Sequence, residues 1–202
     1  MKKIVYDLDG TLIPFNTFKG WIILSIIMPL LCFNFKIFNR VCELVLSRAL
    51  NKIDRLTFKE KLLIEQQEDL FWGKIGSLYA SLLMLFVRRR LLNEKKQNDL
   101  AYLATAAPSI YAKYLSKKIG IFSISLSTDI SNELKMIEVF GEKKKEMVLE
   151  ALMCPPDIFY TDHYDDAPLA KVSKKTYFIK PSVISKEKIL SDKNIGDYEI
   201  IK

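Results

Sequence analysis

The sequence has little of the residue types on which several enzyme classes depend. Its 202 residues include one histidine, His163, which excludes mechanisms that need two, such as zinc sites of the H-E-x-x-H type. Three scattered cysteines, Cys32, Cys42 and Cys154, form neither a disulfide framework nor a C-x-x-C site, and we interpret them as small buried hydrophobic residues. Seven glycines and seven prolines exclude collagen-like and low-complexity chains. The chemistry must therefore come from carboxylates, hydroxyls and lysines.

Long apolar segments are also scarce. Residues 20–35 carry no charge, but these sixteen residues fall short of the roughly 20 that span a bilayer, and Pro29 interrupts a helix. Lys2 and Lys3 lead directly into a short β-prone run at residues 4–6, so the N-terminus lacks the apolar stretch of a signal peptide. We therefore expect a cytoplasmic protein, either free or held peripherally or monotopically on the inner face of the cytoplasmic membrane.

Positive charge is confined to one segment. Residues 12–98 contain 14 Lys and Arg against 7 Asp and Glu, whereas the rest of the chain contains 17 of each, so this segment carries the whole net charge of +7. Such localised charge indicates an anionic partner. The candidates are a membrane surface, a phosphorylated substrate and a nucleic acid.

The apolar pattern predicts an α/β fold with an insertion. Strands are predicted at residues 4–6, 100–104, 121–126, 158–160 and 176–179, and helices at 110–118 and 142–152. This alternation favours a Rossmann-like parallel sheet with helices on both faces, formed by residues 1–11 and 99–202. The pattern of residues 12–98 predicts an all-helical insertion. Within it residues 39–67 are amphipathic, and Thr57 and Glu60 have the spacing of a capping box.

Polar side chains follow three of the predicted strands. Asp7 and Asp9 leave the first strand, and their spacing of two lets both face one pocket. Thr105 and Asp162 follow two later strands, and Asp166 lies four residues beyond Asp162. The carboxyl ends of parallel strands share one edge of a sheet. Because several carboxylates repel one another there, this oxygen-rich set predicts a bound Mg²⁺.

Other residues near these acids are suited to binding an anion. Gly10 allows a tight turn and a close approach of the backbone to a ligand. Thr105 offers a hydroxyl beside a predicted helix N-terminus, which favours negative charge. Lys143, Lys144 and Lys145 open another helix, where positive charge is unfavourable unless one of them reaches an anion. The whole set is typical of phosphoryl transfer.

Four segments, in order along the chain, resemble the motifs of the haloacid dehalogenase-like superfamily of phosphatases, and in particular its phosphoserine phosphatase branch. Residues 7–11, DLDGT, match the first motif, D-x-D-G-T. Residues 104–108, ATAAP, resemble the second, in which a Thr or Ser binds phosphate. Residues 141–144, GEKK, resemble the third motif, G-x-x-K, and residues 161–166, TDHYDD, the fourth, G-D-S-x-x-D.

The resemblance assigns the lysine of the third motif to Lys144, with Lys143 and Lys145 as alternatives. In the fourth motif Thr161 replaces the usual glycine and His163 the usual serine. We therefore expect this loop to differ from that of the family, although both of its acids are in register. We interpret His163 as a loop residue rather than a catalyst, and the neighbouring Asp165 as a helix-start residue rather than a ligand.

The resemblance also implies roles for individual residues. Asp7 would be the nucleophile that forms an aspartyl-phosphate, and Asp9 the acid and base. Gly10, Thr105, Ala106 and Lys144 would bind the phosphate.

The Mg²⁺ ligands implied by the resemblance are Asp7, the backbone carbonyl of Asp9, and Asp162. Asp166 would hold metal-bound water or orient Lys144.

Residues 12–98 occupy the position of the helical cap in this branch, and we call them the cap. Two interpretations of its residues 21–35 are open. They form either a buried helix packed on Leu62, Leu63, Leu78 and Leu82, or a membrane-facing hairpin with its basic flanks at anionic headgroups. The second resembles, more loosely, the phosphatidylglycerophosphate phosphatases of this superfamily.

The sequence thus predicts a Mg²⁺-dependent phosphomonoester hydrolase of a membrane-associated or lipid-like phosphate. The first alternative is a cytosolic phosphatase of a small soluble phosphate such as phosphoserine. An alternative of another class is a non-catalytic module that uses the basic cap to bind nucleic acid or a partner. Because the acid set is complete, we expect no nucleic-acid partner.

Overall fold

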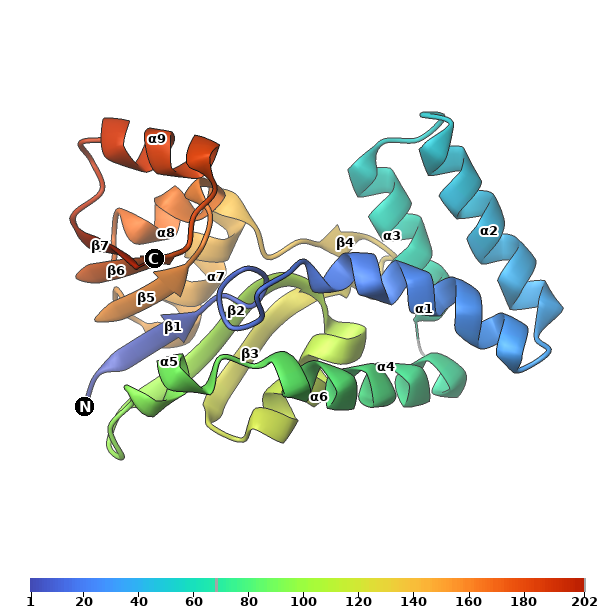
Figure 1. The fold of residues 1–202 in the computed structure, drawn as a ribbon, viewed down its shortest axis with the longest axis horizontal. Coiled ribbons are helices and arrows are strands. Elements are labelled where there is room, and N and C mark those ends of the chain that lie inside the picture. Colours follow the sequence, from blue (N-terminus) through green and yellow to red (C-terminus); the bar gives the residue numbers. More distant parts are fainter. Residues whose placement is uncertain (68, 202) are drawn as a thin grey trace.

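The computed structural model of the chain describes residues 1–67 and 69–201 (Figure 1). Glu68 of the predicted cap and Lys202 of the predicted core lie outside the described residues. The strands form one sheet in the order β4-β3-β2-β1-β5-β6-β7, parallel throughout except for β4, which pairs antiparallel with β3. Their bounds are β1 Lys3–Tyr6, β2 Leu100–Pro108, β3 Phe122–Ile130, β4 Met136–Ile137, β5 Ile158–Thr161, β6 Lys175–Ile179 and β7 Asp197–Ile201.

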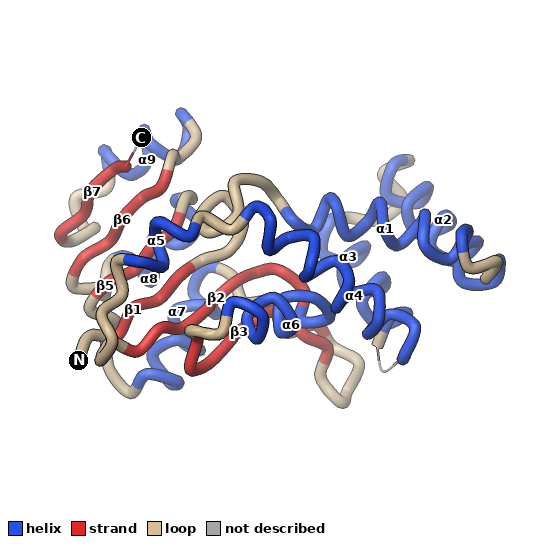
Figure 2. Tube along the Cα trace, turned by 60° about the horizontal axis from the view of Figure 1, so that its bottom comes forward, coloured by secondary structure: helices blue, strands red, loops and turns tan. Residues whose placement is uncertain are grey.

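Helices form the cap and cover both faces of the sheet. The cap contains α1 Thr17–Leu31, α2 Phe35–Ala49, α3 Arg55–Gln66, α4 Leu70–Leu83, the short 3-10 helix η1 Met84–Phe86 and α5 Arg89–Asn93. The core adds α6 Ser109–Ile119, α7 Gly141–Leu152, the 3-10 helix η2 Tyr164–Asp166, α8 Ala167–Ala170 and α9 Val183–Ser191. Figure 1 shows α1, α2 and α3 projecting beyond the carboxyl ends of β1 and β2, whereas α4 lies alongside α6; Figure 2 gives a second view.

The alternation of side chains along β1 divides the core into two layers. Ile4 and Tyr6 pack in a cluster with Leu115 of α6 and with residues of the cap, whereas Val5 packs in a second cluster with Val148 of α7. Successive residues of a strand face opposite sides of a sheet. Because the apolar residues of β1 point to both sides, helices must cover both faces of the sheet. The predicted α/β fold is therefore confirmed.

The helices of the cap differ in detail from the prediction. Residues 39–67 form two helices, because α2 ends at Ala49 and the chain turns through Asn51, which has a φ of +54°. Asp54 is the N-cap of α3, and its side chain accepts a hydrogen bond from the Thr57 backbone N–H at 2.8 Å. The capping-box prediction was wrong, since Thr57 lies inside the helix and Glu60 instead accepts from the backbone N–H of Met136.

Three further expectations need correction. Cys32 is exposed and Cys42 and Cys154 are partly exposed, so the prediction that the cysteines are buried was wrong. Helix α1 continues through Pro29 to Leu31, so the expectation that Pro29 breaks a helix here was wrong. The segment after β6, for which the sequence predicted no elements, adds α9 and β7.

The interpretation of residues 21–35 as a buried helix holds for one face of α1 only. Trp21 is buried against Trp72 of α4 and Tyr111 of α6, with ring centroids 6.0 and 5.4 Å away. Leu78 and Leu82, expected as packing partners, are exposed. None of the described helices is long and apolar enough to cross a membrane.

Candidate active site

Asp7 lies directly after β1, and its side chain is bound by a buried lysine of α7. The Lys144 ammonium, in the first turn of α7, donates to Asp7 Oδ1 at 2.8 Å and to Asp166 Oδ2 at 2.7 Å. Thr161, at the end of β5, donates its hydroxyl to the same Asp166 oxygen at 2.6 Å. All four side chains are buried. Each of these buried carboxylates therefore has the lysine as a hydrogen-bonded partner, which offsets part of the cost of burying its charge.

The other two lysines of this run point away from Asp7. Lys143 forms an ion pair with Glu146 at 3.0 Å, and Lys145 pairs with Glu142. Of the three alternatives that the sequence left open, the structure brings Lys144 to the predicted nucleophile.

Asp9 is held by the first residue of α1. Its Oδ1 accepts hydrogen bonds from the Thr17 backbone N–H at 3.1 Å and the Thr17 hydroxyl at 2.7 Å, and that hydroxyl also lies 2.9 Å from the Tyr111 hydroxyl. Burial raises the pKa of Asp9, although the Thr17 hydrogen bonds oppose the shift. A raised pKa keeps a carboxyl protonated at a higher pH, which is what a general acid requires. Sequence reasoning missed Thr17.

The loop after β1 lies directly against Asp162. Gly10 has a φ of +74°, and a Cβ built there would lie 1.9 Å from Asp162 Oδ2. Arg88, at the end of the cap, donates to the backbone carbonyls of Gly10 and Thr11. Only glycine therefore combines this backbone conformation with the space that the Asp162 carboxylate occupies.

Gly10→Ala is expected to lower the free energy of unfolding by about 1–2 kcal/mol through its left-handed backbone alone, and to reduce activity by displacing Asp162. Gly120→Ala is the matched control, because Gly120 has a φ of +78° and a Cβ added there would meet only the Lys117 carbonyl oxygen, at 3.9 Å. Urea unfolding should show a loss for both variants, whereas activity should fall only in Gly10→Ala. Equal activity of the two variants would contradict the role given to this contact.

The loop after Thr105 is fixed from the cap and from the neighbouring strand. The Thr105 hydroxyl accepts from the Ala107 backbone N–H at 3.0 Å. The Ala106 carbonyl accepts from the Lys59 ammonium of α3 and from the Thr128 hydroxyl of β3, both at 2.8 Å. Lys59 also forms an ion pair with Glu138, which lies just before α7. No sequence signal indicated Lys59, which had the appearance of a solvated lysine on an amphipathic helix.

The carboxylates of the site carry more negative charge than the lysine compensates. Burial raises the pKa of Asp7 to about 8, against the attraction of Lys144. Burial and then the repulsion of Asp166 raise the pKa of Asp162 to about 6. Closely spaced carboxylates with raised pKa values favour binding of a cation, and an all-oxygen set favours Mg²⁺.

The donor set fits a cation held by few side chains. Across residues 1–67 and 69–201, no group of three His, Cys, Asp or Glu side chains lies close enough to hold a metal ion. Asp166 is already engaged by Lys144 and Thr161. The ligands that the motif resemblance implies, Asp7, Asp162 and the backbone carbonyl of Asp9, include only two carboxylates, and small Mg²⁺ ions commonly take one or two carboxylates and keep several waters.

These pKa shifts predict how cation binding depends on pH. Asp162 and Asp7 must lose their protons to bind, so Mg²⁺ affinity should rise with pH across the window from about 6 to about 8, by at most about tenfold per pH unit for each group. Without the cation the folded protein should lose stability as pH rises through this window, because it retains protons that the unfolded chain has already released. Calorimetric titration with Mg²⁺ at pH 5.5, 7 and 8.5 measures the first effect. An affinity that stays constant over this range would contradict the assignment.

The predicted site residues line one cavity of 290 Å³. The core contributes Asp7, Asp9, Gly10, Thr105, Ala106, Lys144, Asp162 and Asp166. His163 and Asp165 also line it and form an exposed pair at 3.1 Å. The cap contributes Asn16 and Arg55, which the sequence analysis did not single out. The structure thus brings every predicted site residue together at the carboxyl edge of the sheet.

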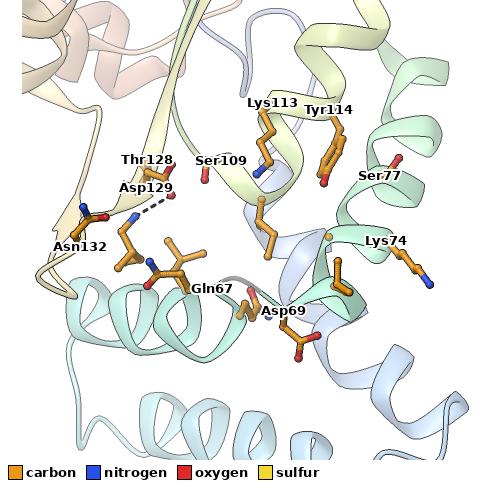
Figure 3. Close-up of a pocket in the computed structure, with 16 residues that line it drawn as sticks. Gln67, Asp69, Lys74, Ser77, Ser109, Lys113, Tyr114, Thr128, Asp129 and Asn132 are labelled. Atoms are coloured by element: carbon orange, nitrogen blue, oxygen red, sulfur yellow. Dashed lines mark hydrogen bonds between the residues drawn. The ribbon is translucent and has the colours of Figure 1, made fainter.

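A larger cavity of 610 Å³ lies elsewhere, between the cap helices α3 and α4 and the core elements α6 and β3 (Figure 3). Lys74, Lys113 and Asp129 line it, and none of the predicted site residues does. Thr128 connects the two regions, because it lines this cavity and donates to Ala106. The lining of this larger cavity mixes acids, bases and amides and does not include the acids of the predicted motifs. The smaller cavity is therefore the candidate active site.

Comparison with known proteins places this fold in a family. The sequence model of the haloacid dehalogenase-like hydrolases matches residues 4–171. No curated protein matches the chain in sequence. A protein of unknown function from Bordetella pertussis Tohama I has the same fold, with a TM-score of 0.72 and 17% identity, and the match covers 100% of this chain and 99% of that chain.

Two further solved structures share the fold at low sequence identity. A phosphoserine phosphatase solved as a phospho-aspartyl intermediate analogue matches with a TM-score of 0.57 and 15% identity, over 99% of this chain and 92% of its own. A phosphoserine phosphohydrolase-like protein from Francisella tularensis subsp. tularensis SCHU S4 matches with a TM-score of 0.57 and 13% identity, over 98% and 95%. Because the family model covers most of the sequence, the chain belongs to the haloacid dehalogenase-like hydrolases, as its four motifs predicted.

Proposed function

We propose that the protein is a Mg²⁺-dependent phosphomonoester hydrolase that acts through an aspartyl-phosphate on Asp7. The observation that carries the proposal is the presence of two carboxylates in one cavity, Asp7 buried and Asp9 partly buried. Asp7 lies 2.8 Å from the Lys144 ammonium, and Asp9 accepts two hydrogen bonds from Thr17. The two acids therefore have different surroundings, which suits them to different roles.

In the proposed reaction an Asp7 carboxylate oxygen attacks phosphorus, and the bond from phosphorus to the leaving alcohol oxygen breaks. Asp9 gives its proton to that oxygen. Asp9, now a carboxylate, then takes a proton from a water molecule, which attacks the phosphorus of the aspartyl-phosphate and releases inorganic phosphate and free Asp7. Bound Mg²⁺ would neutralise charge on the phosphate and the carboxylates.

The other residues hold the transferring group. Lys144 supplies a positive charge beside Asp7, and its bond to Asp166 keeps it oriented. Thr105 and the backbone of Ala106 would bind phosphate oxygens, in a loop held by Lys59 and Thr128. Fixed donors of this kind stabilise charge that develops in the transition state.

The substrate proposed is a membrane-associated or lipid-like phosphate. The position and composition of α1 support this proposal. The first residue of the helix, Thr17, binds Asp9, and the helix contains no charged residue after Lys19. Two structural neighbours are a phosphoserine phosphatase and a phosphoserine phosphohydrolase-like protein, which favours the alternative of a small soluble phosphate. A non-catalytic module that binds nucleic acid would have no need of the Asp9 arrangement.

Phosphate release from p-nitrophenyl phosphate, phosphoserine and lysophosphatidate, each with Mg²⁺ or with EDTA, tests these proposals. Release that requires Mg²⁺ supports the chemistry, and a preference for lysophosphatidate or for phosphoserine decides between the two substrate classes. Binding of RNA or DNA that weakens with salt, without phosphate release from any ester, would support the non-catalytic module instead.

A further inference from the structure

Helix α1 is apolar on its exposed side as well as on its buried side, where Trp21 packs. On its buried side Ser25 is 0% exposed, and its hydroxyl accepts from Gln66 Nε2 at 2.8 Å and donates to the Trp21 carbonyl at 2.9 Å. On the opposite side Ile23 is 56% exposed and Ile27 is 43% exposed. A helix of a soluble protein normally turns its apolar face inward. The outward isoleucines therefore require an explanation beyond packing of the cap.

The exposed apolar side chains continue around the turn from α1 to α2. Leu31 and Phe35 are exposed, and Phe33 between them is 79% exposed with a φ of +56°. Bulky residues rarely adopt this left-handed conformation. The rings of Phe33 and Phe35 lie edge to face, with centroids 6.4 Å apart. Figures 1 and 2 show this turn at the end of the molecule farthest from the sheet.

We call this surface the apolar ridge, formed by Ile23, Ile27, Leu31, Phe33 and Phe35. A single exposed leucine is ordinary, but a contiguous series of large side chains marks an interaction surface. The ridge follows the length of α1, so a flat partner would lie along the helix. Asn16, which lines the candidate active site, is the N-cap of this helix.

The segment of the chain that forms the ridge carries charges of one sign. Residues 10–42 contain three basic residues, Lys19, Lys36 and Arg40, and no aspartate or glutamate. Lys19 and Lys36 flank the two ends of the uncharged run and are exposed. Arg40 is paired with Glu65 at 3.0 Å, so Lys19 and Lys36 are the cations that carry the argument. Exposed apolar side chains flanked in the chain by these two lysines are complementary to a surface that is apolar within and anionic at its border.

We infer that the apolar ridge docks on the surface of an anionic lipid bilayer, with α1 lying along it. The apolar side chains enter the interface and the Lys19 and Lys36 ammonium groups contact lipid phosphates. This inference adds a membrane location to the proposed function. It rests on that function only for the reason why docking would be useful to the protein. It would bring the Asn16 end of α1, and with it the catalytic cavity, to the level of the lipid headgroups.

Co-sedimentation with vesicles tests this inference in the whole protein. Vesicles of phosphatidylcholine alone are compared with vesicles that also contain phosphatidylglycerol. The double variant Phe33→Asn with Phe35→Ser removes two large exposed side chains, and asparagine tolerates the left-handed conformation at residue 33. The matched control, Val183→Ser with Ile184→Ser, removes two exposed apolar side chains from α9, which lies outside the cap.

The wild type should bind the anionic vesicles and bind neutral ones more weakly, and Phe33→Asn with Phe35→Ser should lose roughly tenfold or more in affinity. The control should bind as the wild type does. Absence of binding, equal binding by the two double variants, or a dimer in solution that only the ridge variant abolishes would overturn the inference.

Two readouts keep this inference separate from the proposed function. Asp7→Asn should bind vesicles as the wild type does, and the ridge variant should hydrolyse p-nitrophenyl phosphate as the wild type does. Hydrolysis without vesicle binding would refute the docking alone. Vesicle binding without hydrolysis of any ester would refute the phosphatase alone.

Discussion

Asp7→Asn should lower the turnover of a phosphomonoester by roughly 10⁴-fold or more, while the protein remains folded. An amide oxygen is a poor nucleophile, so no aspartyl-phosphate can form. The substitution nearly preserves shape, and Lys144 keeps its bond to Asp166 at 2.7 Å. Steady-state kinetics measure the loss, and circular dichroism with a thermal melt shows that the fold persists.

Asp165→Asn is the matched control for this experiment. Asp165 lines the same cavity, but it is exposed and forms an ion pair with His163. Its removal should change turnover by no more than a few-fold, as expected for an exposed pair. If Asp165→Asn were as inactive as Asp7→Asn, the loss would reflect the charge of the cavity rather than a nucleophile.

Asp9→Asn should produce the second largest loss, and its size should depend on the leaving group. Removal of a general acid costs roughly 10²–10⁴-fold when the leaving group is an alkoxide that needs a proton. A p-nitrophenolate leaves without one, so formation of the phosphorylated protein from p-nitrophenyl phosphate should suffer much less. Single-turnover kinetics with glycerol phosphate and with p-nitrophenyl phosphate separate the two cases.

The same variant should also hydrolyse its aspartyl-phosphate slowly, because Asp9 activates the water in the second step. Phosphorylated protein should therefore accumulate with p-nitrophenyl phosphate as substrate. An equal loss with both leaving groups, and no accumulation, would assign Asp9 a purely structural role beside Thr17.

The sequence was sufficient to predict the α/β core and the edge of the sheet that carries the acids, because both depend on local patterns. Asp7 and Asp9 are two residues apart on a strand, so their common direction follows from β geometry. The end of β5 at Thr161 could be located from its apolar run, whereas β2 continues three residues past Thr105, to Pro108. Parallel strands bring their carboxyl ends to one edge, so Thr105 still lies at the site. The spacing of the third motif assigned the lysine to Lys144 but left its two neighbours as alternatives, and the burial of Lys144 and its bond to Asp7 decide between them.

The contributions of the cap could not be predicted from the sequence. Thr17, Lys59 and Arg88 each bond to the catalytic loops from positions 8 to 78 residues away in the chain. A lysine that packs under a loop carries no pattern that separates it from a solvated one. The exposure of Leu78 and Leu82 was likewise invisible, because periodicity shows that a helix has an apolar side without showing what covers it.

The measurement that tests the central claim most directly is mass spectrometry of the protein after a rapid acid quench during turnover. The account predicts a fraction of the chain that is heavier by one phosphoryl group, located on Asp7 by peptide fragmentation. This fraction should increase in Asp9→Asn and vanish in Asp7→Asn. Full turnover in Asp7→Asn, or a phosphoryl group on any other residue, would contradict the proposed mechanism.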